Sequence, residues 1–357
     1  MMNKLYFLIA IFLWLSTCKD APKTNLQSKA SNRRAYKKIK GITMGVVPYQ
    51  ITYRGTQNQI LQPRIDSVLV ALNKGASHYE KTSTITQFNQ SEKGIITENN
   101  GYDHHFVNNL LVAKEIVKKT DGYFDPTVAP LVNYYGFGTK GKEGVAAIDT
   151  TKVLNLMQFV GFDKLTITKS KDKYLINKST SKLQLDFSAI AKGYAIDKVG
   201  QFLEKNNIHD YLIDIGGESL AKGKNAKGNW WRVAIQDPKA PRGYYNQEYI
   251  PILETRSMAT SGNYENFRII KGQKMGHTMN PKTGFPELNN MLSATVFAKD
   301  CIIADSYATA FMAMGMEKAF NLAQKLPEID AYLLYLDKNG EMVSKYTQGV
   351  KGIINEK

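Results

Sequence analysis

The amino-acid sequence predicts an α+β fold. Several segments repeat apolar residues at helical spacing, and others alternate apolar and polar residues as strands do. These helices and strands follow one another irregularly, which favours α+β over a doubly wound parallel sheet. The composition is globular, at 43% hydrophobic and 22% charged, and 357 residues suffice for one large domain or two intimate lobes.

Five segments are expected to be helical. The clearest begins at Pro63 and ends at Gly75, because four apolar side chains recur at i, i+3, i+4 and i+7 before the glycine stops the run. The other helices are expected at about Val107–Lys119, Lys152–Phe159, Ala191–Lys205 and Asp305–Lys325.

Strands are expected where β-branched and aromatic residues are dense or alternate with polar ones. They are predicted at Tyr174–Asn177, Leu183–Phe187, Tyr211–Ile215, Trp230–Ile235, Ser293–Ala298, Ala331–Leu336 and Met342–Lys345. Asn339-Gly340 is typical of a hairpin turn between the last two strands.

The first 18 residues resemble the signal of an exported lipoprotein. Lys4 precedes an 11-residue apolar run, Leu5–Leu15, which is too short to cross a bilayer. Ser16-Thr17-Cys18 then resembles the bacterial lipobox, whose cysteine receives lipid. An ordinary signal peptide cut nearby is the alternative, and both interpretations predict export.

Residues 19–40 are predicted to be a basic, flexible tether that precedes a folded domain at residues 41–357. Eight Lys or Arg residues and one Asp give the tether a charge of +7, out of +15 for the chain. Beside a lipid anchor this charge would strengthen attachment to anionic phospholipid, although a solvated leash explains it equally well. It lends no support to nucleic-acid binding.

Cysteine and histidine are scarce. Two cysteines, Cys18 and Cys301, exclude a disulfide framework and a CxxC zinc site, and Cys301 is expected to be a buried, small apolar residue. The five histidines form no HExxH motif, and His104 and His105 are expected at the surface. His277 differs, because it lies in a turn-rich motif and histidine titrates near the working pH of a general base.

The segment from Thr120 to Gly138 is a long apolar loop that carries the carboxylate of Asp125. A flat aromatic ligand with hydrogen-bonding edges is one way to satisfy the polar backbone of such a loop. The alternative, slightly favoured by the residues alone, is a structural loop in which Asp125 caps the Pro126-Thr127 turn.

Two further segments could bind a nucleotide and its metal. Small residues, including Ser188 and Ala189, join a predicted strand to a helix with Lys192 in its first turn, an arrangement that suits phosphate or simply close packing. Asp305 and Thr309 share one face of a predicted helix, where they could bind Mg²⁺. More commonly such an Asp is a helix N-terminal acid and such a Thr bonds back to a carbonyl.

Taken in order, eight segments resemble the FAD:protein FMN transferases, the ApbE-type flavin transferases. They are GITMG (41–45), STITQFN (83–89), the Phe124-Asp125-Pro126 loop, LDFSAIAKGYAID (185–197), DIGGE (214–218), TSGNY (260–264), the His277 segment and ADSYATA (304–310). The resemblance covers nearly all of residues 41–357. It implies a bilobal α+β fold with mixed sheets flanked by helices, and a site for FAD and Mg²⁺ between the lobes.

The resemblance also implies an activity, transfer of the FMN part of FAD onto a Thr or Ser hydroxyl of an acceptor protein with release of AMP. The metal ligands would be the carbonyl of Ala189 and the side chains of Asp305 and Thr309. The residues in contact with FAD would be Met44, Tyr123, Phe124, Asp125, Asp186, Lys192 and Thr278. His277 would deprotonate the acceptor hydroxyl, and the apolar loop would shelter the flavin and adenine rings.

The chain departs from the family pattern at Asn263 and Asn280, where Asp is common. The loss of a carboxylate could change the hydrogen bonding around His277 or remove an additional metal ligand. By resemblance, the acceptors would be subunits of membrane electron-transfer complexes of the sodium-pumping quinone reductase or Rnf type. An exported protein, lipid-anchored to a bacterial membrane and facing the periplasm, would share one surface with them. The sequence does not identify the acceptor, the membrane and leaflet, or the oligomeric state.

Three other functions compete. A non-catalytic FAD-binding lipoprotein and an FAD pyrophosphatase that releases FMN and AMP both fit the same fold. The segments Ser179–Lys182, Ser261–Asn263 and Lys282–Gly284 also resemble the SxxK, SxN and KTG motifs of penicillin-recognising enzymes. The sequence around these motifs argues against penicillin-recognising enzymes. In that class the SxxK serine begins a buried helix and KTG lies on a strand, whereas Ser179 falls in a polar turn and prolines bracket the KTG segment.

Overall fold

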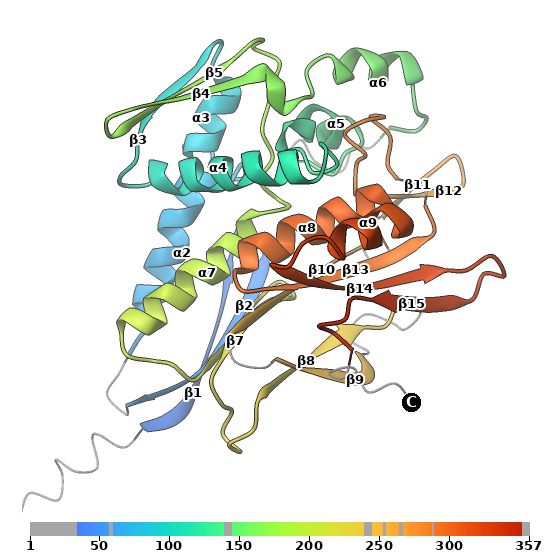
Figure 1. Ribbon diagram of the computed structural model, residues 1–357. Helices are drawn as coiled ribbons and strands as arrows, with labels where there is room; N and C mark the ends of the chain where they lie inside the picture. Colours follow the sequence, from blue (N-terminus) through green and yellow to red (C-terminus); the bar gives the residue numbers. More distant parts are fainter. Residues whose placement is uncertain are drawn as a thin grey trace, which may run out of the picture.

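The computed structural model describes residues 34–56, 60–138, 145–238, 245–252, 255–263, 267–287 and 289–351. An eight-stranded sheet forms its lower layer, with helices lying across one face (Figure 1). In spatial order, the strands are β1 (Arg34–Thr43), β2 (Val47–Thr56), β6 (Tyr211–Ile215), β7 (Glu218–Lys222), β10 (Arg256–Gly262), β13 (Met291–Ala298), β14 (Ile329–Leu336) and β15 (Met342–Tyr346).

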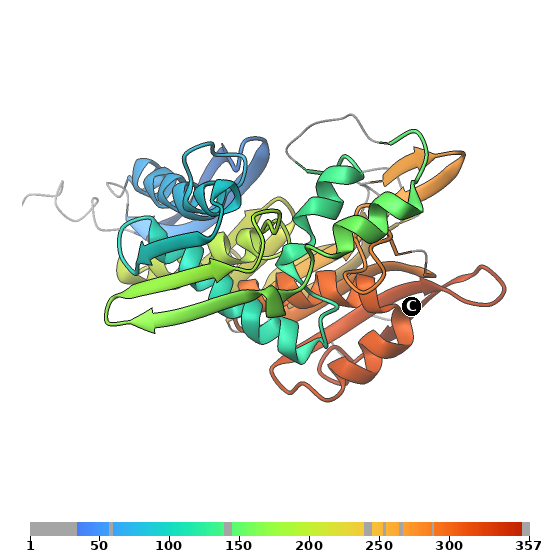
Figure 2. The same ribbon diagram turned by 90° about the horizontal axis from the view of Figure 1, so that it is seen from above.

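Helices cover the upper face of this sheet and continue into a second lobe above it (Figures 1 and 2). The helices are α2 (Gln62–Ala76), α3 (Thr84–Gln90), α4 (Asp103–Lys119), α5 (Ala129–Tyr134), α6 (Thr150–Met157), α7 (Ala191–Lys205), α8 (Cys301–Met314) and α9 (Met316–Ala323). The upper lobe also holds a three-stranded sheet, in the order β3 (Gly94–Glu98), β5 (Lys173–Lys178) and β4 (Leu165–Ser170).

Two small ribbons complete the described architecture. One pairs β8 (Trp231–Gln236) with β9 (Tyr245–Ile252), and β8 covers the lower face of the large sheet with Trp231 and Val233. The other pairs β11 (Phe267–Ile270) with β12 (Gln273–Gly276) near α5 and α6. The α+β, bilobal prediction is confirmed, although every pairing between the described strands is antiparallel rather than mixed.

The main core lies between the large sheet and the helices. Along β2, the alternate residues Tyr49, Ile51 and Tyr53 are buried, as the period of two in a strand requires. Helix α8 is buried on nearly all sides, because it packs on β10 and β13 below and against α7 beside it. The described residues contain no helix that is both long and apolar enough to span a bilayer.

The predicted elements are largely confirmed, and the helix expected at Ala191–Lys205 has those bounds. The tether prediction is wrong at its end, because residues 34–40 belong to β1, and Arg34 pairs with Thr56 in the β1–β2 hairpin. Seven residues that were assigned to the tether, 34–40, therefore belong to a strand, because each of them pairs with a residue of β2. The signal segment, Cys18 and the tether before Arg34 lie outside the described residues.

The strand predicted at Leu183–Phe187 is not formed. Its side chains alternate as expected, with Leu183, Leu185 and Phe187 buried. Its backbone, however, bonds to loop backbone at Pro126 and to a side chain, instead of to a neighbouring strand. The amide of Leu185 donates to Asn89 Oδ1 at 2.7 Å, and its carbonyl accepts from Asn89 Nδ2 at 2.9 Å.

The helix predicted at Asp305–Lys325 is two helices. Helix α8 begins four residues earlier, at Cys301, and Gly315 separates it from α9 with a left-handed φ of 75°. The surface assignment of His105 is wrong, because the side chain is buried and its Nδ1 lies 3.0 Å from the hydroxyl of Tyr194. Cys301 is buried and free, as predicted.

Candidate functional site

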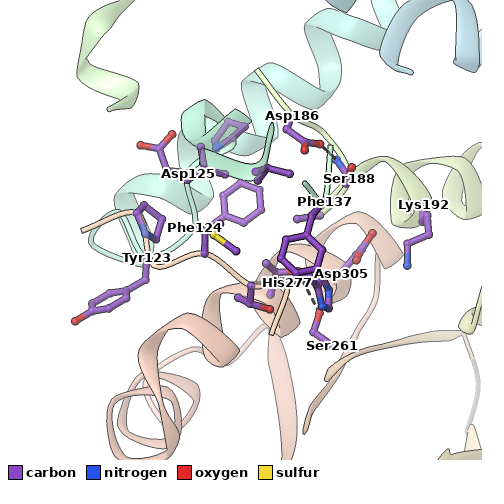
Figure 3. Close-up of a pocket in the computed structure, with 18 of the residues that line it drawn as sticks. Tyr123, Phe124, Asp125, Phe137, Asp186, Ser188, Lys192, Ser261, His277 and Asp305 are labelled. Carbon is purple, nitrogen blue, oxygen red and sulfur yellow. Dashed lines mark hydrogen bonds between the residues drawn. The ribbon is translucent and has the colours of Figure 1, made fainter. Parts of the chain in front are cut away.

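A pocket opens where the two lobes meet. Its wall comes from α5 and the loops on either side of it, the segment that leads into α7, the β6–β7 turn, the end of β10, the turn after β12 and the inner face of α8. Figure 3 shows side chains from these separate segments converging, with His277 and Phe137 near the centre and Asp305, Ser261 and Lys192 around them.

Ten of the eleven site residues predicted from the sequence line this pocket. They are Tyr123, Phe124, Asp125, Asp186, Ala189, Lys192, His277, Thr278, Asp305 and Thr309. Met44 does not line it. That residue holds a left-handed φ of 48° in the β1–β2 turn, and its side chain packs against the main core. Contact between these residues and FAD stays a prediction.

Asp305 lies in the second turn of α8, not at its N-terminus. It is 3% exposed, and its Oδ2 accepts the amide of Gly193 from α7 at 3.0 Å. Thr309, one turn later, lies 3.1 Å from the hydroxyl of Ser261, measured between the oxygens. Both side chains therefore face the pocket, and neither adopts the alternative predicted for it.

Gly193 sets the distance between α7 and α8. A Cβ at this position would overlap the carbonyl of Cys301, which belongs to the backbone of α8 and cannot swing away. Alanine normally favours a helix over glycine by about 1 kcal/mol. Here we expect Gly193→Ala to destabilise the protein by about 1–3 kcal/mol, because the clash of the added methyl group with α8 outweighs the higher helix propensity of alanine.

Chemical denaturation of Gly193→Ala and of the matched variant Gly200→Ala measures this effect. A Cβ at Gly200 would lie 2.8 Å from Leu220 Cδ2, the end of a flexible side chain that can move aside. Gly200→Ala should therefore cost less stability. Equal unfolding free energies for the two variants would contradict the assigned role of Gly193.

Asp197 holds the start of α8. Its two carboxylate oxygens accept the amides of Cys301 at 2.7 Å and Ile302 at 2.9 Å, and α8 needs such acceptors at its first turn. Burial raises the pKa of Asp197 to about 7, although these two amides oppose the shift. The carboxyl therefore titrates far above its ordinary value of 3.8.

This raised pKa predicts a pH dependence of stability. Between about pH 4 and pH 7 the folded protein binds more protons at Asp197 than the unfolded chain does. The contribution of Asp197 to stability is therefore present below pH 4 and is lost as the pH rises through 7. Urea unfolding at several pH values should show a flatter dependence for Asp197→Asn than for the wild type and for the exposed control Asp172→Asn. Parallel curves for all three proteins would show that Asp197 does not titrate in this window.

The carboxylate of Asp125 is engaged by the protein itself. Its Oδ1 accepts the amide and the hydroxyl of Thr127, at 2.8 and 2.7 Å, and its Oδ2 accepts the amide of Phe162 at 3.0 Å. The predicted cap on the Pro126-Thr127 turn is therefore present. Burial raises the pKa of Asp125, while these hydrogen bonds hold it back.

Asp186 also lines the pocket, beside the Asp125 loop, because its amide donates to the carbonyl of Pro126 at 2.7 Å. Its Oδ1 accepts the amide of Ser188 at 2.7 Å and lies 3.4 Å from His78 Nδ1. Nothing in the local sequence pattern distinguishes His78, a histidine in the loop after α2. Only the fold brings it to Asp186.

His277 follows directly after β12. Its ring centroid lies 6.3 Å from that of Phe137, edge to face, and the guanidinium of Arg268 covers Phe137 at 5.3 Å. Asn280 organises the next turn, because its Nδ2 donates to Glu287 and its Oδ1 accepts the amide of Lys282. Asn263 packs on Gly276, and its buried Oδ1 has no hydrogen-bond partner among the described residues.

Glu218 is the most informative residue that the sequence analysis left without a role. It is 3% exposed, lines the pocket and forms an ion pair with Lys192. Burial raises the pKa of Glu218 to about 7, with Lys192 opposing and Asp305 adding to the shift. Burial alone would lower the pKa of Lys192, but Glu218 and Asp305 raise it above its usual range. The DIGGE segment could have pointed to Glu218, because this acid directly follows two glycines at a turn.

The penicillin-recognising alternative finds no support in the geometry. Ser179 lies in a turn after β5, outside the pocket lining, and its amide donates to the carbonyl of Lys164. Lys282 lies in a turn, not on a strand, and its ammonium pairs with Asp121 at 2.7 Å. The three motifs therefore do not assemble into one site.

The residues present fit a magnesium ion that is shared with a ligand. Asp305 supplies one buried carboxylate, and Thr309 and Ala189 line the same pocket. No cluster of three or more His, Cys, Asp or Glu residues suited to a metal occurs in the described part of the chain. Mg²⁺ does not need one, because it commonly takes one or two carboxylates together with waters and phosphate oxygens.

Comparison with known proteins identifies the family of this chain. Residues 44–333 match the model of the ApbE family. FAD:protein FMN transferase from Haemophilus influenzae is 32% identical over 324 residues, which cover 89% of this chain and 92% of that protein. The enzyme of the same name from Vibrio cholerae is 34% identical, over 80% of this chain and 84% of its own.

Solved structures give the same result. The flavin transferase ApbE from Vibrio cholerae superimposes with a TM-score of 0.78 at 30% identity, covering 90% of this chain and all of its own. The apo flavinyl transferase ApbE from Pseudomonas stutzeri also reaches 0.78, at 28% identity, over 91% of this chain and 98% of its own. The likeness in fold therefore extends over about nine-tenths of the chain.

Proposed function

The chain belongs to the ApbE family, and on this premise we propose that it transfers FMN from FAD, with Mg²⁺, to a Thr or Ser hydroxyl of an acceptor protein and releases AMP. The observation that carries the proposal is the pocket itself. It brings a histidine suited to proton transfer, His277, together with the carboxylate of Asp305, the hydroxyl of Thr309 and the ammonium of Lys192. These are the groups that phosphoryl transfer requires.

The reaction exchanges one phosphorus–oxygen bond for another. The acceptor hydroxyl oxygen forms a bond to the phosphorus on the FMN side, the bond from that phosphorus to the bridging oxygen breaks, and AMP departs with the bridging oxygen. His277 takes the hydroxyl proton. Lys192 lies where it can pair with diphosphate oxygens and offset their charge.

Ala189, Asp305 and Thr309 would hold the metal. When bound, Mg²⁺ would neutralise charge on the diphosphate oxygens. The aromatic rings of Phe124 and Phe137 line the pocket and give a ring system an apolar contact surface. Because the carboxylate oxygens of Asp125 are already occupied, that residue would serve FAD chiefly by shaping its loop.

The test is a transfer assay. Purified protein, FAD, Mg²⁺ and an acceptor domain are combined, and the acceptor is examined by mass spectrometry for the added mass of FMN. Covalent flavin on a Thr or Ser of the acceptor supports the proposal. FMN and AMP released without acceptor labelling would identify a pyrophosphatase, and intact FAD would identify a binding protein.

We also propose that the protein is exported and lipid-anchored at Cys18, with membrane electron-transfer subunits as acceptors. The lipobox-like segment and the basic residues that follow it support this placement. Labelling cells with a tagged fatty acid should mark the wild type but not Cys18→Ser. A labelled Cys18→Ser protein would refute the anchor without bearing on the transfer reaction.

A further inference from the structure

Lys192 and Glu218 form an ion pair in the wall of the pocket, although 26 residues separate them in the chain. Lys192 lies in the first turn of α7, and Glu218 is the first residue of β7. The Lys192 side chain is 27% exposed, whereas that of Glu218 is 4% exposed. Both residues line the pocket, and the lysine is the more exposed member of the pair.

The second carboxylate oxygen of Glu218, Oε2, is buried and has no hydrogen-bond partner among the described residues. Leaving such an oxygen unsatisfied is unfavourable, and an arrangement of this kind usually has a functional reason. Glu218 lines the pocket, but its Oε2 is buried and its Oε1 accepts from Lys192. Lys192 is therefore the direct route by which Glu218 can influence a ligand.

The local backbone leaves little freedom for the pair. Gly216, with a φ of 66°, and Gly217, with a φ of 105°, form the turn between β6 and β7 just before Glu218. A Cβ at Gly216 would lie 3.6 Å from Lys192 Cδ and 3.7 Å from Glu218 Oε2. The bare glycine backbone thus packs against both side chains of the pair.

Lys192 has a second carboxylate nearby. Asp305 attracts the ammonium as Glu218 does, but only Glu218 holds it by a hydrogen bond among the described residues. An ammonium has three donors, so a single bond to Glu218 leaves two for other acceptors. Without Glu218, Asp305 would be the remaining carboxylate to draw Lys192 toward itself.

We propose that Glu218 is a positioning residue, which holds Lys192 toward the FAD diphosphate and keeps it from pairing with the metal ligand Asp305. This inference rests on the proposed transfer function. Glu218 itself touches no reacting atom. Its contribution lies in the direction of the lysine donors, since a misplaced charge stabilises the transition state less well.

A double-mutant cycle tests the proposal. Glu218→Gln, Lys192→Met and the double variant are compared with the wild type for transfer kinetics and for FAD affinity, measured by flavin fluorescence. We expect Glu218→Gln to lower kcat/KM about 10-fold and Lys192→Met about 100-fold. In the Lys192→Met background, Glu218→Gln should cause no more than about a 2-fold further loss, because its partner is already absent.

A purely structural role gives a different pattern. Glu218→Gln would then reduce activity by the same factor in both backgrounds, and that result overturns the proposal, as does wild-type activity in the single variant. Glu204→Gln is the matched control, because Glu204 pairs with Lys222 at 2.9 Å outside the pocket lining, and its kinetics should be unchanged.

Two further measurements keep the test decisive. If circular dichroism shows that Glu218→Gln does not fold, Glu218→Asp takes its place. This variant keeps the negative charge but moves it one methylene away from Lys192, and its loss of activity should likewise disappear in the Lys192→Met background. If the wild type transfers no flavin, the proposed function fails on its own evidence. The cycle in FAD affinity then decides the positioning role separately.

Discussion

Replacing His277 with alanine should reduce flavin transfer by about 10²- to 10⁴-fold, the range over which a general base usually acts. The side chain lines the pocket that also holds Asp305 and Thr309, so its loss removes the group that we propose takes the hydroxyl proton. FAD affinity should change little, because the ring contacts and Lys192 remain. The result is a fall in kcat with KM for FAD nearly constant.

Mass spectrometry of the acceptor, sampled over time, measures this rate. His209→Ala is the matched control, because His209 is an exposed histidine outside the pocket lining and its loss should leave the rate unchanged. Transfer at the wild-type rate in His277→Ala would remove His277 from its assigned role. It would leave the binding pocket and the family assignment intact.

Replacing Asp305 with asparagine should reduce Mg²⁺-dependent transfer at least about 100-fold, because the buried carboxylate proposed as a metal ligand is lost. Asparagine keeps an oxygen that can accept the amide of Gly193, so the contact between α7 and α8 is retained. It also leaves Glu218 and Lys192 as a balanced pair, since Asp305 is the second carboxylate beside that lysine. The variant should therefore fold.

Thermal unfolding gives a measurement independent of activity. Mg²⁺ and FAD together should raise the melting temperature of the wild type, because a ligand that binds only the native state stabilises it. Mg²⁺ should add nothing to the effect of FAD in Asp305→Asn. The control Asp300→Asn, an exposed acid just before α8, should behave like the wild type. An undiminished Mg²⁺ effect in Asp305→Asn would exclude Asp305 as a ligand.

Local patterns located part of the fold and the composition of the site, but they missed β1, β2, β7 and β10 of the large sheet. The spacing of apolar residues located α2 and α7, because a helix buries one face and its period depends only on near neighbours. The family motifs named the residues of the pocket, although they lie on segments more than 180 positions apart. Only the fold shows that the loop at Asp125 and the helix at Asp305 share one pocket.

What the sequence determined by itself is a part of the helices and strands, those with a clear apolar pattern, together with the residue types that carry the chemistry. The tertiary structure decided the partners: Asn89 for the segment at Leu185, Tyr194 for His105 and Glu218 for Lys192. The physical reason is distance along the chain. Periodicity reports which residues face inward, whereas hydrogen bonds and ion pairs between remote segments depend on how the whole chain packs.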